Sequence, residues 1–241
     1  IFAITVPHAG YIYSGQVAAY AYAHLQGKDY RTVVIIGPSH HTRFPFISVN
    51  IEQNYKTPLG IAETDVSLGR ELMNMDKDLF RYYAPAHEKE HSVEVQIPFI
   101  QKVQPDSKIL VLIMGTQDRE TIKKTGEYLY RLLSKHPDIL LVASSDYSHY
   151  YDYATARNMD SVCIQDIDEL DVDALLDHLE NHQCQMCGGG PVASVLYAVK
   201  KIGCTSDNVH LLKYANSGDV TGDKSRVVGY AAFLVEGCNT D

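Results

Sequence analysis

The sequence predicts an α/β protein, with a mostly parallel central sheet, helices on both faces and an antiparallel pair of strands near the C-terminus. Four short apolar runs have the composition of buried strands, and the segments between them repeat apolar residues at helical spacing. Two further strand-like runs are joined by a polar loop, which is typical of an antiparallel pair. No repeat or linker interrupts the pattern, so we expect a single domain over residues 1–241.

The predicted strands are rich in β-branched residues and do not alternate in polarity, as expected of strands that are covered on both sides. They are residues 2–6, 32–36, 109–114 and 139–143, and the C-terminal pair is residues 209–214 and 226–235. Ser14 is a candidate cap for a helix that ends near residue 25, and Thr64 or Asp65 for a second helix. Residues 90–103 and 118–133 are further predicted helices.

Composition excludes several classes of protein. With 45% hydrophobic and 21% charged residues, the chain is neither disordered nor collagenous nor a coiled coil. No apolar run approaches the length of about 18 residues that a membrane span requires. The net charge of −9, without any basic block, argues against nucleic-acid binding.

The cysteines and the N-terminus bear on where the protein works. The five cysteines are odd in number, the chain is long, and it has no secretory signal. We therefore expect reduced thiols in the cytoplasm, in place of a disulfide framework. The chain begins at Ile1, already inside an apolar run, and we expect it to be a fragment or a processed chain.

Reactive side chains follow the predicted strands at the points where the strands end. His8 follows the first strand, His40 and His41 the second, and Asp146 and His149 the fourth. Ligands of open parallel sheets bind beyond the carboxyl ends of the strands. A single histidine there is usually a cap or a turn residue, but histidines at three strand ends favour one shared metal or acid–base site. Gly10 and Gly37 beside them are expected to allow sharp turns and close approach to a ligand.

His91 and Glu94 form another candidate cluster at the start of a predicted helix. Their side chains, three residues apart, share a helical face and can point together into a site. The alternative is that Glu90 and Glu94 favour the helix N-terminus electrostatically and that His91 is incidental.

Cys184 and Cys187 form a CxxC pair, but no second pair completes a structural zinc site, and no strand precedes them as in thioredoxin-like motifs. Cys187 alone is the better candidate. It precedes a glycine run and a helix predicted to begin near Pro191, where a lowered pKa favours the thiolate. Cys184 is then either a redox partner of Cys187 or a buried apolar residue.

Seven motifs occur in a fixed order between residues 7 and 232: PHAGYIYSG, GPSHH, KTPLG, EHSVEVQIP, SSDYSHY, CGGGP and VVGYAA. With these motifs the chain resembles the Memo family, called AmmeMemoRadiSam system protein B in prokaryotes. The resemblance implies a fold related to that of class III extradiol ring-cleaving dioxygenases, which are non-haem iron enzymes. Family members usually carry a further segment before PHAGY, in keeping with the expectation of a fragment.

The resemblance also implies a metal site and a set of partners. Matched by motif, the metal ligands are His8, His40 and Cys187, and Asp146 and His149 lie beside the metal. The implied metal is Fe(II), with Zn(II) and Cu(I) as alternatives, and the implied partner proteins are of the radical-SAM and AMMECR types.

The cysteine stands where the dioxygenases use a carboxylate, so their activity does not transfer with the fold. We expect an iron-dependent redox enzyme in which the candidate catalytic residues are His149, Asp146 and His91. His149 would move a proton, oriented by Asp146, and a small-molecule substrate would reach Ser144, Ser145 or His91. The alternatives are a metal-binding or phosphopeptide-binding protein without turnover, and a zinc-dependent hydrolase.

Overall fold

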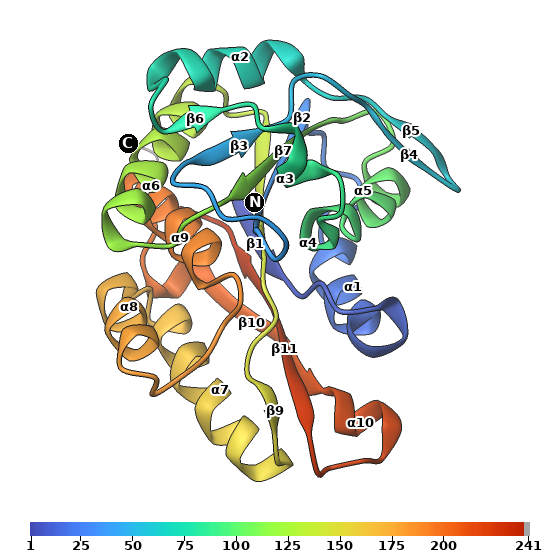
Figure 1. Cartoon of the computed structure of the whole chain (residues 1–241), viewed down its shortest axis with the longest axis vertical. Helices are drawn as coiled ribbons and strands as arrows, with labels where there is room; N and C mark the ends of the chain where they lie inside the picture. The colour runs from blue at the N-terminus through green and yellow to red at the C-terminus, as the bar shows by residue number, and fades with distance from the viewer. Residues whose placement is uncertain (239–241) are drawn as a thin grey trace.

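The computed structural model describes residues 1–238, which fold around a central mixed sheet with helices on both faces (Figure 1). The strand order is β10-β11-β1-β8-β2-β7-β3-β6, and β9 pairs with the N-terminal end of β11. The strands of this sheet are β1 (Ala3–Val6), β2 (Thr32–Pro38), β3 (Ile47–Val49), β6 (Phe80–Arg81), β7 (Lys108–Met114), β8 (Ile139–Ser144), β9 (His149–Tyr151), β10 (Val209–Asn216) and β11 (Val227–Val235).

The centre of the sheet is parallel, as the sequence predicts. β1 pairs in parallel with β8, β8 with β2, and β2 with β7. The two C-terminal strands form an antiparallel pair, and β11 joins them to the main sheet by pairing antiparallel with β1. The four predicted central strands and the C-terminal pair are thus confirmed, with boundaries shifted by at most two residues.

Both faces of the sheet are buried, which explains why the strands read as continuous apolar runs. Along β2, Val33 and Ile35 point into one hydrophobic core, and Val34 and Ile36 point into the other. The helices on the first face are α1 (Gln16–Ala23), α4 (His91–Glu94) and α5 (Ile97–Val103). Those on the second are α2 (Val66–Met75), α6 (Arg119–Lys135), α7 (Tyr153–Asp168), α8 (Val172–Glu180) and α9 (Gly189–Ile202).

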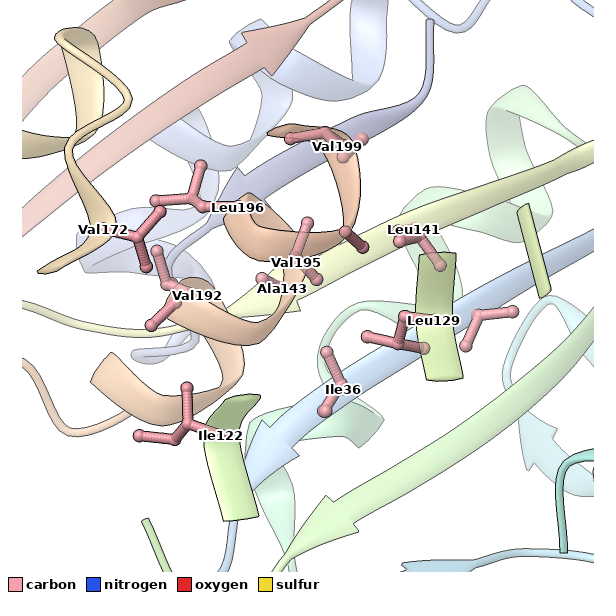
Figure 2. Close-up of a cluster of buried hydrophobic side chains, with 14 of the residues drawn as sticks. Ile36, Ile122, Leu129, Leu141, Ala143, Val172, Val192, Val195, Leu196 and Val199 are labelled. Atoms are coloured by element: carbon pink, nitrogen blue, oxygen red, sulfur yellow. The ribbon is translucent and has the colours of Figure 1, made fainter. Parts of the chain in front are cut away.

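Helices α6 and α9 form the densest contact on the second face. Figure 2 shows Ile122 and Leu129 of α6 beside the row of aliphatic side chains that α9 lays over β2 and β8. Gly126 allows the two helices to cross closely, because a Cβ atom there would lie 2.6 Å from the Cβ of Tyr197. This contact fixes α9, and with it the segment that carries Cys187.

Several local predictions need correction. Ser14 does not cap a helix: it lies inside a π-helical turn (Tyr11–Gly15) and donates to the carbonyl of Ala9. Residues 90–103 form two short helices, because Pro98 lacks the N–H that would continue α4 into α5. The predictions of Asp65 as the cap of α2 and Asp118 as the start of α6 are confirmed.

Other elements were not predicted. The KTPLG motif forms a separate hairpin of β4 (Tyr55–Thr57) and β5 (Gly60–Ala62). The short elements β3, β6, β9, α3 (Ala84–His87) and α10 (Ser217–Thr221) were also not predicted, because each spans only two to five residues and is too short to show a period. The bounds of the longer helices α7 and α8 were not predicted either.

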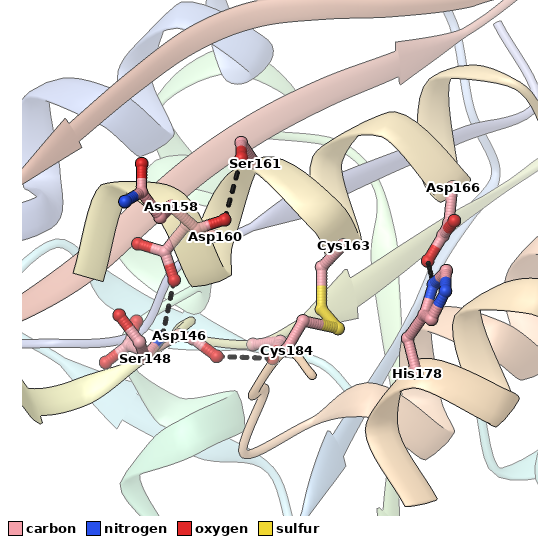
Figure 3. The surroundings of a disulfide bond; sticks show 10 residues. Asp146, Ser148, Asn158, Asp160, Ser161, Cys163, Asp166, His178 and Cys184 are labelled. Atoms are coloured by element: carbon pink, nitrogen blue, oxygen red, sulfur yellow. Dashed lines mark hydrogen bonds and ion pairs between the residues drawn. A yellow bond between two sulfur atoms is a disulfide. The ribbon is translucent and has the colours of Figure 1, made fainter. Parts of the chain in front are cut away.

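The expectation of reduced cysteines is wrong for four of the five. Cys163 of α7 is bonded to Cys184 (Figure 3). Cys204 is bonded to Cys238. Cys184 is therefore neither a partner of Cys187 nor an isolated apolar residue. The pairs are 21 and 34 residues apart, and neither separation is a motif that sequence can reveal.

Within the described part of the chain, none of the helices combines the length and the apolar character that crossing a membrane requires.

Candidate metal centre

Three parallel neighbours, β1, β8 and β2, end at the same edge of the sheet and bring their following residues together. His8 follows β1 and His40 follows β2, and their ring centroids lie 5.2 Å apart. Cys187 arrives from the segment before α9, with its Sγ 3.1 Å from Nε2 of His8. One ligand atom from each of His8, His40 and Cys187 lies within 4.8 Å of the others, which is a possible metal-binding arrangement.

The hydrogen bonds around His8 define which ring nitrogen is free. The Ser144 hydroxyl donates to the carbonyl of Ser92 at 2.6 Å, so it accepts from Nδ1–H of His8 at 2.9 Å. Gln96 donates to the same hydroxyl. His8 therefore holds its proton on Nδ1 and turns the Nε2 lone pair toward His40 and Cys187, as a metal ligand must.

His40 is oriented in the same way by a carboxylate. Nδ1 of His40 lies 2.8 Å from Oε1 of Glu90, and the backbone N–H of His40 donates to Oε2 at 2.6 Å. Burial would raise the pKa of Glu90, but the hydrogen bonds from His40 and from the Ser92 N–H lower it to about 2. Glu90 is thus ionised and holds the proton of His40 on Nδ1, which leaves Nε2 for a metal.

In a second grouping, His40 with Glu90 and His91, the possible ligand atoms also lie within 4.8 Å of one another. It is the poorer candidate, because the Glu90 oxygens already accept three hydrogen bonds from His40 and Ser92. Glu90 is better described as the residue that orients His40.

The pKa values of His8 and Cys187 differ from those of exposed side chains. Burial, together with the rings of His40 and His91, holds the pKa of His8 well below its ordinary value of 6.5. Burial raises the pKa of Cys187 to about 12, and the nearby Asp146 adds to the rise. The lowered pKa predicted for Cys187 from the start of α9 is therefore wrong, since loss of solvation outweighs the helix terminus.

The loop of Cys187 is held from several sides. The N–H of Asp146 donates to Cys187 Sγ at 3.2 Å, and Ser145 Oγ accepts from the N–H of Gly188 at 2.9 Å. Gln117, after β7, donates to the carbonyl of Cys187 and accepts from the N–H of Gly190. The cysteine thus occupies a fixed position.

The donor set fits a transition metal. Two imidazoles and one thiolate suit iron, zinc or reduced copper and are poor ligands for Mg²⁺ or Ca²⁺. Three protein ligands also leave coordination positions open, which is the arrangement of catalytic metal sites. The geometry is consistent with a divalent metal.

An open cavity of about 480 Å³ borders this centre. Its lining includes the three candidate catalytic residues His91, Asp146 and His149. The ring of His91 stacks on His40 at 5.0 Å, so His91 lies beside the ligands.

Asp146 is placed differently from the prediction that it orients His149. Its Oδ1 accepts from the backbone N–H of His8 at 2.7 Å and from that of Ala9 at 3.3 Å. Within residues 1–238 no hydrogen bond joins Asp146 to His149. Burial raises the pKa of Asp146 to about 6, against the opposing effect of these hydrogen bonds and of His149. Asp146 therefore fixes the loop of His8 and shares only the cavity with His149.

Five other residues singled out in the sequence also have clear outcomes. Ser144 and Ser145 are buried and engaged in the hydrogen bonds above, so they are not available to a substrate. Gly37 is needed for close approach, because a Cβ there would lie 2.7 Å from Ser92 Oγ, whereas Gly10 has room for one. His41 is exposed, 6.3 Å from the ring of His91, and lies outside the ligand group.

The residues that orient the ligands were missed by the sequence analysis. Glu90 and Gln96 stand in the EHSVEVQIP motif, and Gln117 follows the end of the third predicted strand; these positions were their only signals. Their partners lie 50 to 89 positions away along the chain, and such contacts leave no local pattern.

Comparisons with known proteins agree with this architecture. A family model described as Memo-like protein matches residues 1–234. A MEMO1 family protein of Methanosarcina mazei is 43% identical over 232 residues, covering 95% of this chain and 84% of that protein. One from Nitrosopumilus maritimus is 36% identical over 238 residues, covering 97% and 84%.

A crystal structure of an uncharacterised protein from Escherichia coli K12 has the same fold. It superposes with a TM-score of 0.64 and covers 96% of this chain and 98% of its own, at 14% sequence identity. At that identity the likeness concerns the fold alone. The family match and the archaeal relatives extend over nearly the whole chain, and the chain belongs to the Memo family.

Proposed function

We propose that this protein is a metal-dependent redox enzyme whose metal, Fe(II) by preference, is held by His8, His40 and Cys187. One observation carries the proposal: the three donors converge beside an open cavity whose lining includes two imidazoles outside the ligand set. Structural metal sites have closed coordination, whereas this one combines open positions with a nearby space for a small molecule.

The bound iron would supply electron transfer and a coordination position for a co-substrate. The chain's own residues would do the rest. Glu90 and Ser144 keep both ligand histidines in one tautomer, and Asp146 holds the His8 loop. His149, half-buried in the cavity wall, is the group that can hold or move a proton of a bound molecule.

The first test is metal content, measured by elemental analysis on protein purified without oxygen and without a metal-binding tag. We expect near-stoichiometric iron. In His40→Ala and Cys187→Ser we expect the metal affinity to fall by more than about 100-fold, because loss of even an outer-shell partner costs about 10- to 100-fold. His210→Ala, an exposed histidine on β10, is the matched control and should bind metal like the parent.

His149→Ala separates chemistry from metal binding. We expect it to keep its metal and to lose the oxygen- and substrate-dependent reaction of the parent. Zinc in the parent protein would favour hydrolysis instead. Absence of any metal after anaerobic reconstitution would contradict the proposal and favour a partner-binding role of the same pocket.

One further part of the proposal rests on the resemblance. We name radical-SAM and AMMECR-type proteins as the partners of this protein. Co-purification from the native host checks the partners.

A further inference from the structure

The cavity beside the metal centre has a second wall, built from the hairpin that joins β10 to β11. Figure 1 shows this hairpin, with α10, extending past the body of the sheet alongside β9. It contributes Ser217 and Arg226 to the cavity, while His91 and His149 contribute the side next to the candidate ligands. At about 480 Å³ the cavity has the size of a small-molecule site.

An irregularity in the pairing of β9 with β11 places Arg226. Tyr151 pairs with Val227 and His149 with Val228, so Tyr150 is an extra residue on β9. Tyr150 has a φ of 67°, a left-handed conformation that is costly for a bulky side chain. Bulges of this kind redirect side chains next to binding sites.

The result of the bulge is an exposed cation on an exposed ring. The guanidinium carbon of Arg226 lies 5.2 Å from the ring centre of Tyr150, which is 62% exposed. Burial of apolar surface does not explain a strained, exposed tyrosine. Stacking does explain it, because the ring holds the guanidinium at one place in the cavity wall.

In the part of the chain that the structure describes, Arg226 has no carboxylate partner. Within residues 1–238 it makes no ion pair, and the carboxylate of Asp223 in the same wall accepts instead from the N–H and hydroxyl of Ser225. Its planar fork of N–H donors matches a carboxylate, which it can bind through two parallel hydrogen bonds. Three tyrosines, Tyr13, Tyr150 and Tyr230, line the same cavity and offer flat apolar surface beside its polar residues.

We propose that the cavity binds a small organic acid with a flat apolar body, whose carboxylate pairs with Arg226 and whose other end faces the metal centre. The inference rests on the proposed function only in that the end of the ligand opposite the carboxylate would react at the metal. The anion site itself consists only of residues of this chain and does not require the metal.

The test is calorimetric titration of the protein with benzoate and phenylacetate, and with their uncharged amides. We expect the acids to bind the parent protein and the amides to bind it more weakly. In Arg226→Gln the affinity for the acids should fall by about tenfold or more, as expected for the loss of hydrogen bonds to a charged group, while the amides are unaffected. The affinity of Arg226→Lys for the acids should lie between those of the parent and Arg226→Gln, because lysine keeps the positive charge but lacks the planar pair of N–H donors.

Arg157→Gln is the matched control. Arg157 is also exposed and stacked on tyrosines, Tyr153 and Tyr214, but lies outside the cavity. We expect its variant to bind both acids like the parent. Equal binding of acids and amides, failure of both acids to bind the parent, or acid binding unchanged in Arg226→Gln would each overturn the inference.

Running the titrations on metal-free and metal-loaded protein separates this inference from the proposed function. If the parent holds no metal but Arg226→Gln weakens acid binding, the proposed function fails and the anion site stands. If acid binding requires the metal and ignores Arg226, the carboxylate binds the metal directly and the anion site is overturned.

Discussion

At the scale of single residues, the site depends on which nitrogen each histidine presents. His8 and His40 have no common sequence context beyond a strand end. Both nevertheless engage Nδ1 with an oxygen, which leaves Nε2 as the nitrogen that can bind a metal. Ser144 does this for His8 and Glu90 for His40. A histidine whose Nδ1 had no acceptor would populate the other tautomer and lose part of its affinity for metal.

We therefore expect Glu90→Gln to weaken metal binding by about 10- to 100-fold while the fold is kept. The amide removes the negative charge that holds the proton on Nδ1 of His40. Competition with a chromophoric chelator measures the affinity. Glu94→Gln, an exposed residue of the same helix, is the control, and parent-like affinity in Glu90→Gln would show that His40 is not oriented in this way.

At the scale of elements, the helices are fixed to the sheet by buried polar contacts at their ends. Asp65 is the clearest case. It caps α2 by accepting from the N–H of Leu68, and it accepts from Thr32 at the start of β2 and from Arg31. One side chain thus fixes the angle at which α2 lies on the second face.

We expect Asp65→Ala to lower the free energy of unfolding by about 2–3 kcal/mol, the sum of a lost cap and the unsatisfied hydroxyl of Thr32. Chemical denaturation measures the difference. Asp29→Ala also removes one carboxylate, and because Asp29 lies in an exposed irregular segment we expect little change in stability.

The Asp65 contribution should depend on pH. Burial would raise the pKa of Asp65, but the bonds from Thr32 and Leu68 and the charge of Arg31 lower it below 3.8. A depressed folded-state pKa means that the stabilisation is complete above the ordinary value and disappears as the pH falls through the folded-state value. The stability gap between parent and Asp65→Ala should narrow below about pH 4; a gap that stays constant would contradict the ionic part of the argument.

At the scale of the whole molecule, the site joins segments that are distant in the chain, and the Cys163–Cys184 disulfide connects two of them. It ties α7 to the loop three residues before Cys187. Beside it, His178 of α8 pairs with Asp166 of α7 at 2.7 Å (Figure 3). The covalent and polar links together hold the loop against α7 and α8.

Replacing both cysteines of this pair by serine should lower stability by about 3 kcal/mol, the usual effect of opening a loop of this length. It should also weaken metal binding, because the Cys187 loop loses its anchor. The double variant Cys204→Ser/Cys238→Ser is the control. Its disulfide links the region after α9 to the end of β11, so it should lose stability without losing metal affinity. Equal metal affinity in the two double variants would show that the Cys163–Cys184 disulfide does not support the metal site.

The sequence by itself determined the sheet, its two covered faces and the candidate residues at the strand ends. Patterns such as the apolar run at residues 32–36 are local. A strand that is buried on both sides needs apolar residues at every position, so the run is visible in the sequence. The histidine positions followed from the same strands, because parallel strands place their carboxyl ends together.

Only the tertiary structure decided how those residues act. The Glu90–His40 pair, the burial that raises the pKa of Cys187, the two disulfides and the bulge at Tyr150 all depend on residues far apart in the chain. Such contacts depend on how close the side chains lie and how far they are removed from solvent in the folded molecule. They leave no periodic pattern in the sequence. For the same reason Arg226 is a residue of the cavity only after β11 has paired with β9.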